Sequence, residues 1–426
     1  MQITITSRAW VVAGLMGLSL LGGLITGQPI FSDMAWMFMG LLLVGLVWTV
    51  TSLWGVRVSR RVRSRRSQVG RIFEERLIVR NTNWVPKLWV ELFDDSDLPN
   101  HQVTQVVSRL GAGVQFSWAV RTLCVRRGRF QLGPAMLQGG DPFGLFLATR
   151  QLPAVTNVVV YPPVFAIDGF VTPLGTAPGG EALRRRTPFM TPNAAGVRDY
   201  QVGDSLSRIH WRSSARRDRL MVKEFELDPL GDVWVVLDGF ERDHVRPLAA
   251  EVDFLAQQEA FWTRDTLVKL PGDTESYTVA AAASLVQFFV RRDRPVGLIA
   301  FGNVRESIAP DAGERQLLRI LETLAVWRAE GELPLNDLLG IELHNFSRGA
   351  TVVIVTPSEE KRWLIAADTL RRRGLKVAVV VVDRTSFGGS RNVTAGATYG
   401  SVQMPVYVLR EGEDVGRVLS LPFGRG

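Results

Sequence analysis

Two uncharged apolar segments near the start of the chain constrain its fold most. They cover residues 9–25 and 35–55, and a short polar turn containing Pro29 separates them. A helix rises about 1.5 Å per residue, so the second segment is long enough to cross a hydrocarbon core of roughly 30 Å. Neither segment contains an ionisable side chain, which argues against a proton or ion path inside it. We therefore predict a membrane-spanning helical hairpin over residues 1–56.

A cleaved signal peptide is the alternative for the first segment. Only Arg8 precedes it as a basic residue, no small-x-small cleavage site stands out, and a second apolar segment follows at once. Residues 57–71, from Arg57 to Arg71, contain seven arginines and no acid, whereas the turn between the apolar segments has no Lys or Arg. The positive-inside rule then places the protein in the cell membrane with its soluble domains in the cytoplasm. This basic juxtamembrane segment is also expected to contact anionic lipid headgroups.

The net charge of +8 comes mostly from the membrane flank. Residues 1–71 hold eight arginines against one acid, which gives +7 and leaves +1 for the rest of the chain. Nucleic-acid binding is therefore not expected. RNA binding through the basic stretch from Arg184 to Lys223 is a third possibility, but that stretch lacks interleaved aromatic residues. Cys124 is the only cysteine, so a disulfide framework and a zinc ribbon are excluded, and we expect a buried thiol.

The pattern changes to short alternating runs over residues 72–165. Strands are predicted at 76–80, 88–92, 114–120 and 124–132, separated by clusters of Asn, Asp, Pro and Gly. The run 141–146 (DPFGLF) predicts a tight turn, because Pro142 sets φ and Gly144 supplies backbone freedom. This spacing is typical of a small β-sandwich, and it contains no catalytic constellation.

Residues 228–426 alternate between apolar strands and helices. Strands are predicted at 232–237, 296–301, 351–355, 376–382 and 406–409, with helices at 276–291, 317–328 and 358–373. Such alternation predicts a doubly wound α/β domain whose parallel sheet is covered on both faces. Ligands in these sheets bind at the carboxyl ends of strands. Asp238 and Asp383 each follow a predicted strand directly.

Between these regions, residues 166–227 form a connector rich in charge. Residues 196–226 contain five carboxylates, seven basic side chains, Tyr200 and Trp211. Buried or half-buried charges must be paired. We therefore predict an ion-pair network that fixes one domain against the next, in which these acids face the arginines: Asp199, Asp204, Asp218 and Glu224.

The connector also carries a signature. It resembles that of the DUF58 family of bacterial and archaeal membrane-anchored proteins, with these residues at the matching positions: Arg198, Tyr200, Gly203, Asp204, Arg208, Ile209, Trp211, Ser214, Ala215, Arg216, Leu220, Val222, Lys223 and Glu224. The family's biochemical role is largely undefined. Its members are typically encoded beside MoxR-type AAA+ ATPases, and often near other A-domain membrane proteins. The resemblance therefore implies that these proteins are partners.

The order of strands and helices in the last domain resembles a von Willebrand factor A-like domain. Metal-binding members hold Mg²⁺ with a D-x-S-x-S motif after the first strand. Here Asp238 is kept, but Phe240 and Arg242 replace the two serines, and Thr356–Pro357–Ser358 follows the 351–355 strand. No cofactor is therefore expected, and Asp238 is the one weak candidate for a metal ligand.

The expected function is that of a non-enzymatic scaffold or adaptor acting with a MoxR-type ATPase in assembly or maturation of protein complexes. The chain contains no G-x-x-x-x-G-K-[ST] loop and no G-x-S-x-G elbow. Its four histidines are scattered, and His210 is expected to be hydrogen-bonded rather than a general base. The alternative is a binder or enzyme acting on an anionic, phosphate-bearing ligand through Asp204, Arg208 and Arg216, since Arg geometry suits phosphate.

Overall fold

The computed structural model describes residues 1–153, 155–171, 194–200, 209–225, 231–246, 270–360, 362–390 and 404–421. They fall into two compact units, one built on Met1–Pro163 and the other on the chain from Val164 onward. The first unit contains the apolar helices and a β-sandwich, and the second contains an α/β domain.

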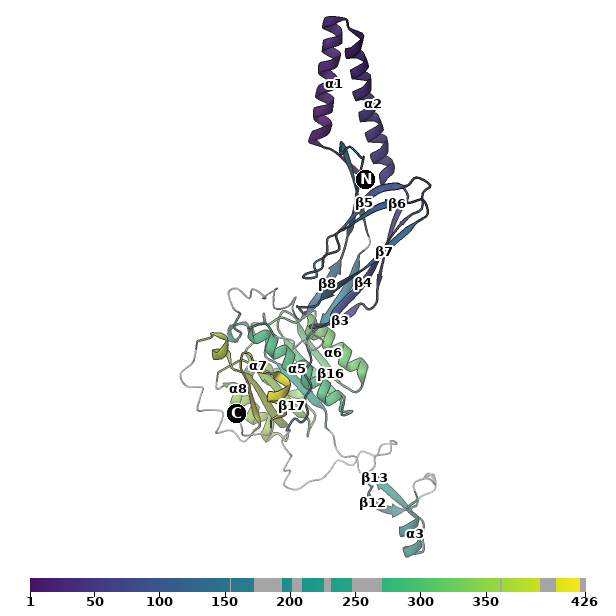
Figure 1. Cartoon of the computed structure of the whole chain (residues 1–426). Coiled ribbons are helices and arrows are strands. Elements are labelled where there is room, and N and C mark those ends of the chain that lie inside the picture. Colours follow the sequence, from purple (N-terminus) through teal and green to yellow (C-terminus); the bar gives the residue numbers. More distant parts are fainter. Residues whose placement is uncertain are drawn as a thin grey trace. The chain divides into compact units, whose positions relative to one another are not determined.

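The apolar segments form two helices that pack side by side, α1 (Ser7–Thr26) and α2 (Pro29–Ser52) (Figure 1). Gly27 ends α1 with a φ of 65°, and Pro29 occupies the first turn of α2. Both helices are long and apolar enough to cross a membrane. Their outer faces carry exposed apolar side chains, among them Leu18, Leu24, Ile25, Trp36, Met37 and Leu43.

Both helices are joined to the same end of the sandwich. A strand that precedes α1, β1 (Gln2–Ile5), pairs antiparallel with β10 (Phe146–Leu152). The Thr6 hydroxyl donates to the carbonyls of Gly144 and Leu145 at 2.7 and 2.9 Å, and the Thr49 hydroxyl of α2 donates to the Phe146 carbonyl at 3.3 Å. The predicted hairpin of residues 1–56 therefore begins with a strand of the sandwich.

The predicted β-sandwich is confirmed. A five-stranded sheet with the order β1-β10-β9-β5-β6 packs against the three-stranded sheet β2-β4-β7. A second three-stranded sheet, β3-β11-β8, packs against Phe73 of β4 in a separate cluster. Leu77 and Val79 from one side meet Leu92 and Leu137 from the other in the core, and all four are fully buried. The remaining strands are β2 (Val56–Val62), β3 (Arg66–Gln68), β4 (Ile72–Asn81), β5 (Lys87–Asp94), β6 (Gln105–Leu110), β7 (Gln115–Leu123), β8 (Gly128–Leu132), β9 (Ala135–Gly140) and β11 (Thr156–Tyr161).

The basic segment 57–71, predicted to lie on lipid headgroups, instead contributes β2 and β3 to the sandwich. Its apolar residues alternate with polar ones, and this period of two turns Arg60 inward, where its side chain is only 4% exposed. The prediction that the whole segment lies on lipid headgroups is therefore wrong for Arg60. A strand rises about 3.3 Å per residue, and β3 lies at the end of the sandwich away from the helices (Figure 1). Arg57, at the start of β2, is the arginine of this segment nearest to the end of α2.

Two local predictions in the sandwich are confirmed. The 141–146 run is a closed turn: the Asp141 carboxylate accepts hydrogen bonds from the amides of Phe143 at 2.8 Å and Phe146 at 2.6 Å, and Gly144 has a φ of 70°. Cys124 is 1% exposed, and burial raises the pKa of its thiol. A buried thiol with a raised pKa is a packing residue.

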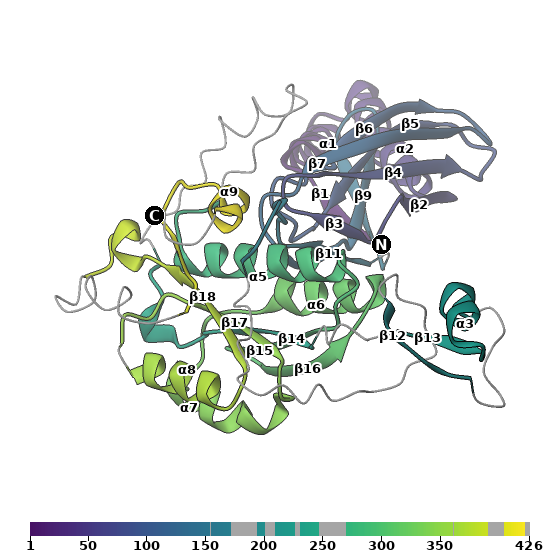
Figure 2. The ribbon, with the colours of Figure 1, turned by 90° about the horizontal axis from the view of Figure 1, so that it is seen from below.

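The α/β domain contains a six-stranded sheet with the order β16-β15-β14-β17-β18-β19, in which only β16 is antiparallel. The helices α5 and α6 cover one face of this sheet, and α7 and α8 cover the other (Figure 2). The predicted doubly wound architecture is confirmed as a mixed, mostly parallel sheet. The strands are β14 (Val233–Leu237), β15 (Val296–Phe301), β16 (Arg305–Asp311), β17 (Thr351–Thr356), β18 (Lys376–Val382) and β19 (Val406–Leu409).

The helices of this domain include three that overlap the predicted ranges 276–291, 317–328 and 358–373, and two, over residues 335–341 and 415–420, that were not predicted. They are α5 (Thr274–Val290), α6 (Glu314–Val326), α7 (Leu335–Ile341), α8 (Arg362–Arg372) and α9 (Val415–Ser420), with 3₁₀ turns at Glu241–Asp243, Glu342–Asn345 and Arg384–Phe387. The connector adds a two-stranded antiparallel ribbon, β12 (Ala194–Asp199) with β13 (Met221–Phe225), and a short helix α3 (Trp211–Arg217).

Candidate functional site

The carboxyl edge of the six-stranded sheet is the first place to search for a site. The chain passes from β14 to its neighbour β15 on one side, and β17 lies on the other side of β14. In open α/β sheets, ligands bind where the strand order reverses in this way. Asp238 follows β14 directly, and Thr356 ends β17. The two residues therefore meet at the switch point.

Both carboxylate oxygens of Asp238 accept hydrogen bonds from other residues of the protein. Its Oδ2 accepts the Thr356 hydroxyl at 2.6 Å, and its Oδ1 accepts the Phe240 amide at 3.1 Å. The side chain is fully buried. Burial raises the pKa of Asp238 to about 7, against the opposing effect of the Thr356 hydrogen bond. This carboxyl group is therefore much easier to protonate than an exposed one.

A second carboxyl group, Asp243, lies nearby on the 3₁₀ turn after β14. Burial raises its pKa, and a hydrogen bond from the Ser358 side chain and the charge of Arg384, 3.8 Å away, work in the opposite direction. The charge of Glu360 raises the pKa of both Asp238 and Asp243. The edge of the sheet is thus an acidic environment that disfavours a further negative charge.

The residues at this edge do not fit the Mg²⁺ site for which Asp238 was the weak candidate. That arrangement requires two hydroxyls after the aspartate, whereas Phe240 contributes only its amide and Arg242 is exposed. Both Asp238 oxygens already accept hydrogen bonds. Among the residues that the structure describes, the one group of three His, Cys, Asp or Glu side chains whose ligand atoms converge lies in the β-sandwich instead.

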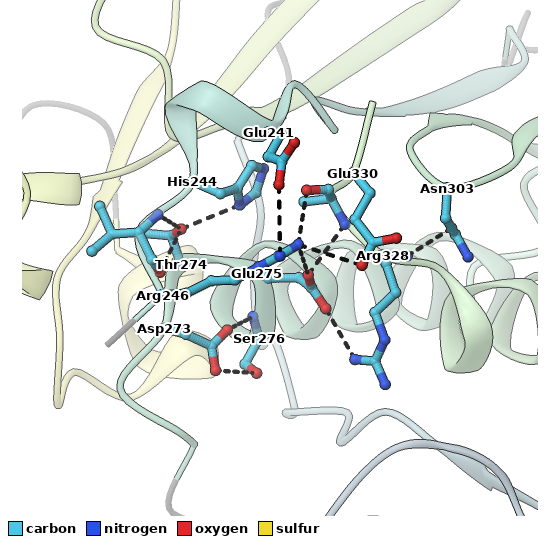
Figure 3. Close-up of polar contacts among 12 residues, drawn as sticks. Glu241, His244, Arg246, Asp273, Thr274, Glu275, Ser276, Asn303, Arg328 and Glu330 are labelled. Atoms are coloured by element: carbon cyan, nitrogen blue, oxygen red, sulfur yellow. Dashed lines mark hydrogen bonds and ion pairs between the residues drawn. The ribbon is translucent and has the colours of Figure 1, made fainter. Parts of the chain in front are cut away.

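A polar network joins this edge to the start of α5 (Figure 3). The Glu275 carboxylate is 3.1 Å from Arg328 Nη1, and it accepts the Ala329 amide at 3.1 Å and Arg246 Nη2 at 3.4 Å. Thr274 Oγ1 lies 3.2 Å from His244 Nδ1, and the other ring nitrogen of His244 lies 2.9 Å from the Asp238 carbonyl oxygen. The network holds α5, the segment after β14 and the segment after α6 together. No motif in the sequence indicates that these residues meet.

Removing the charge of Glu275 is expected to weaken this network. Glu275 is 6% exposed, and hydrogen bonds to charged groups contribute about 1.5–3 kcal/mol. Glu275→Gln should therefore lower the free energy of unfolding by about 2 kcal/mol. Glu330→Gln is the matched control, because that side chain is 50% exposed and 3.8 Å from Arg246; its effect should stay below about 0.5 kcal/mol. Hydrogen exchange of α5 measures both, and equal protection factors in the two variants would contradict the assignment.

The ribbon β12–β13 and the helix α3, which carry the signature, are held together by contacts of the Ser214 hydroxyl with the backbone. The Ser214 hydroxyl donates to the His210 carbonyl at 3.1 Å and accepts the Met221 amide at 2.9 Å. His210 Nδ1 accepts the Ser213 amide at 3.1 Å, which caps α3 and confirms a hydrogen-bonded role for this histidine. The Tyr200 amide donates to the Leu220 carbonyl at 2.9 Å.

The charged residues of the signature only partly match the predicted network. Asp199 pairs with Arg219 at 3.1 Å, but both side chains are more than half exposed, and such pairs contribute little. Trp211 is 68% exposed and Arg216 is also exposed. Gly203, Asp204 and Arg208 lie outside the described residues, and the side chains of Arg198, Lys223 and Glu224 are likewise not described. The buried network and the anionic-ligand site through Asp204, Arg208 and Arg216 stay predictions.

Residues 196–258 match the family model described as "Protein of unknown function DUF58". The matched residues include the signature from Arg198 to Glu224. The chain is 24% identical over 249 residues to "Uncharacterized protein YeaD" of Bacillus subtilis (strain 168), and the match covers 57% of this chain and 55% of that protein. The chain thus aligns with about half the length of this curated relative.

Solved structures resemble this chain over about a quarter of its length. The CARDB domain of the PF1109 protein from Pyrococcus furiosus has 13% identity and a TM-score of 0.18, covering 25% of this chain and 91% of that chain. The complex of Zinc 2-glycoprotein and Prolactin inducible protein from human seminal plasma has 9% identity and a TM-score of 0.20, covering 24% and 92%. These values carry no argument about function.

Proposed function

We propose that this DUF58 protein is a membrane-anchored scaffold or adaptor whose soluble domains face the cytoplasm and act with a MoxR-type AAA+ ATPase in assembly or maturation of protein complexes. The observation that carries the proposal is the way the apolar hairpin is built into the β-sandwich. Its α1 and α2 expose apolar side chains along their length, a surface that lipid is suited to cover.

The position of β1 supports two retained spans over a cleaved signal peptide. Cleavage after α1 would remove β1 as well, and β1 forms one edge of the five-stranded sheet through its pairing with β10. The strand before α1 and the strand after α2 belong to the same sandwich, so both ends of the hairpin lie on one side of the membrane. Exposed Arg57, a few residues after the end of α2, favours the cytoplasmic side.

The α/β domain supports a binding role over a catalytic one. Its strand order with one antiparallel edge is similar to that of von Willebrand factor A-like domains. Asp238 occupies the position of the first metal ligand in those domains, and it accepts hydrogen bonds from the Thr356 hydroxyl and the Phe240 amide. On α3 of the connector, exposed Trp211 and Arg216 are of the types enriched at interface hot spots. The charge of Arg216 favours an acidic surface on the partner.

Capture from gently solubilised native membranes tests the proposal. The full-length protein is purified with its bound proteins, which are identified by mass spectrometry, alongside Arg216→Glu and the control Arg373→Glu. Arg373 is another exposed arginine, and it follows α8. We expect an AAA+ ATPase of the MoxR type with the wild type and Arg373→Glu, and at least a tenfold loss with Arg216→Glu. Absence of any such ATPase from the wild-type sample would refute the partnership, and recovery of the protein outside the membrane fraction would refute the anchor.

A further inference from the structure

Five polar side chains meet inside the β-sandwich, far along the sequence from the signature. Arg60 comes from β2, Glu75 from β4, Asp94 from the end of β5, His101 from the loop before β6 and Thr122 from β7. The side chains of the four ionisable members are at most 4% exposed. Burying an ionisable group costs free energy unless the group is paired or hydrogen-bonded. The contacts among these side chains must therefore account for their burial.

Arg60 contacts one oxygen of each carboxylate. Its Nε lies 3.2 Å from Glu75 Oε2, and its Nη2 donates to Asp94 Oδ1. The guanidinium therefore fixes both carboxylates through these two atoms. The remaining oxygens, Glu75 Oε1 and Asp94 Oδ2, are the ones closest to the imidazole of His101.

The imidazole completes a convergent set of three atoms. His101 Nδ1 lies 2.9 Å from Thr122 Oγ1, while Nε2 lies 3.1 Å from Glu75 Oε1 and 3.8 Å from Asp94 Oδ2. The three side chains offer ligand atoms that all lie within 4.8 Å of one another. Asp94 Oδ2 is buried and accepts no hydrogen bond from the described residues.

We propose that Glu75, Asp94 and His101 form a binding site for a first-row divalent cation of the Zn²⁺ class. Zinc is held by imidazole nitrogen and carboxylate oxygen at about 2.0–2.2 Å, with three protein ligands in its open sites. Atoms bound at that radius in a tetrahedron lie roughly 3.3–3.6 Å apart, between the 3.1 Å from His101 Nε2 to Glu75 Oε1 and the 3.8 Å from it to Asp94 Oδ2. The imidazole favours such a cation over Mg²⁺ or Ca²⁺, which prefer oxygen alone.

The surrounding contacts suit outer-shell roles. Ligating histidines carry a hydrogen bond on their other ring nitrogen, and ligating carboxylates are hydrogen-bonded in turn. Thr122 occupies the first role, while Arg60 donates a hydrogen bond to Asp94 and forms an ion pair with Glu75, so both are positioning residues. With both carboxylates ionised, the two carboxylates and the guanidinium sum to one negative charge, which a divalent cation would more than offset at the point where the three ligand atoms meet.

A proton on His101 is the competing occupant. It would give a neutral cluster and would bridge Nε2 to Glu75 Oε1 at 3.1 Å. Asp94 Oδ2, at 3.8 Å, lies beyond hydrogen-bond reach, so a proton leaves that buried oxygen unsatisfied. A metal ion placed among the three atoms satisfies all of them.

Zinc binding to the full-length protein in detergent tests the site. The protein carries a histidine-free affinity tag, is stripped with a chelator and is titrated with Zn²⁺, with Co²⁺ absorption as the spectroscopic readout. We expect one equivalent of Zn²⁺ per chain and a Co²⁺ band that His101→Gln shifts or removes. Glu75→Gln should abolish stoichiometric binding. Thr122→Val should weaken binding about 10–100-fold, as expected for an outer-shell contact.

The matched control is Glu74→Gln, the neighbouring residue on β4, whose side chain is 34% exposed. It should bind Zn²⁺ as the wild type does. Circular dichroism of each variant shows whether loss of binding reflects loss of the sandwich, and Thr122→Val, which removes only a hydroxyl, provides a second variant if Glu75→Gln does not fold. Failure of the wild type to bind Zn²⁺, or equal binding by folded Glu75→Gln and Glu74→Gln, would overturn the proposal and leave a protonated ion cluster.

Discussion

Gly239→Ala is expected to destabilise the α/β domain by about 3 kcal/mol, the upper end of the usual effect of overpacking. Gly239 follows Asp238, where the chain leaves β14 and passes the end of β15. A Cβ at this position would lie 1.7 Å from the carbonyl oxygen of Phe301 and 2.9 Å from the Trp327 ring. Since the nearest atom belongs to the backbone, the β15 end must move as a whole. That movement would also disturb the Asp238–Thr356 contact at the switch point.

Gly340→Ala is the control with the opposite expected sign. Gly340 lies within α7, and a Cβ added to it would meet no atom within 4 Å. Alanine is favoured over glycine in a helix interior by about 1 kcal/mol, so this variant should be stabilised. Thermal unfolding of the full-length protein in detergent, with hydrogen exchange of β14 and β15, compares the two. Equal midpoints for the two variants would show that the edge of the sheet tolerates a side chain.

The buried parallel strands could be predicted from sequence because both of their faces are apolar. The predicted run 296–301 coincides with β15, and 376–382 coincides with β18. The antiparallel edge strand β16 was not predicted, since its sequence RESIAPD is mostly polar and buries only Ile308. Edge strands need one apolar face at most, so periodicity gives little signal for them.

The basic segment shows two signals in competition. Its composition indicates a membrane flank, while its alternation of valine with polar residues indicates a strand. The structure satisfies the second signal: Val56, Val58 and Val62 lie on the inner side of β2, and Arg60 shares their face. A charge on the apolar face of a strand could have been read as a buried ion-pair partner.

The sandwich cluster could be half anticipated in the same way. In β4, Phe73, Glu75, Leu77 and Val79 alternate with more exposed residues, which places Glu75 on the buried face. Its partners Asp94 and His101 come from the opposing sheet and from a loop. Which residues of two sheets meet depends on sheet packing and loop path, and strand periodicity contains neither. The histidine spacing therefore gave no sign of this site.

Asp238→Asn is expected to become increasingly stabilising relative to the wild type as the pH rises. Burial raises the pKa of Asp238 from 3.8 to about 7. Between these values the folded protein holds a proton that the unfolded chain has released, so the free energy of unfolding falls as pH rises through this window. This rise in pKa corresponds to a change of about 4 kcal/mol in the free energy of unfolding across the window. Asparagine has no proton to lose and keeps an acceptor for the Phe240 amide.

The difference in unfolding free energy between Asp238→Asn and the wild type should therefore be small near pH 4 and reach its maximum above pH 7, on the order of 4 kcal/mol. Asp368→Asn supplies a control of opposite sign. Hydrogen bonds from Arg372 and Arg371 lower the pKa of that exposed carboxyl group, so its contribution is present at neutral pH and is lost on acidification. Urea titrations of the full-length protein at several pH values, followed by near-ultraviolet circular dichroism, measure both differences. A constant difference for Asp238→Asn from pH 5 to 8 would mean that the buried carboxyl group is ionised throughout, and that the acidic edge of the sheet is open to a cation after all.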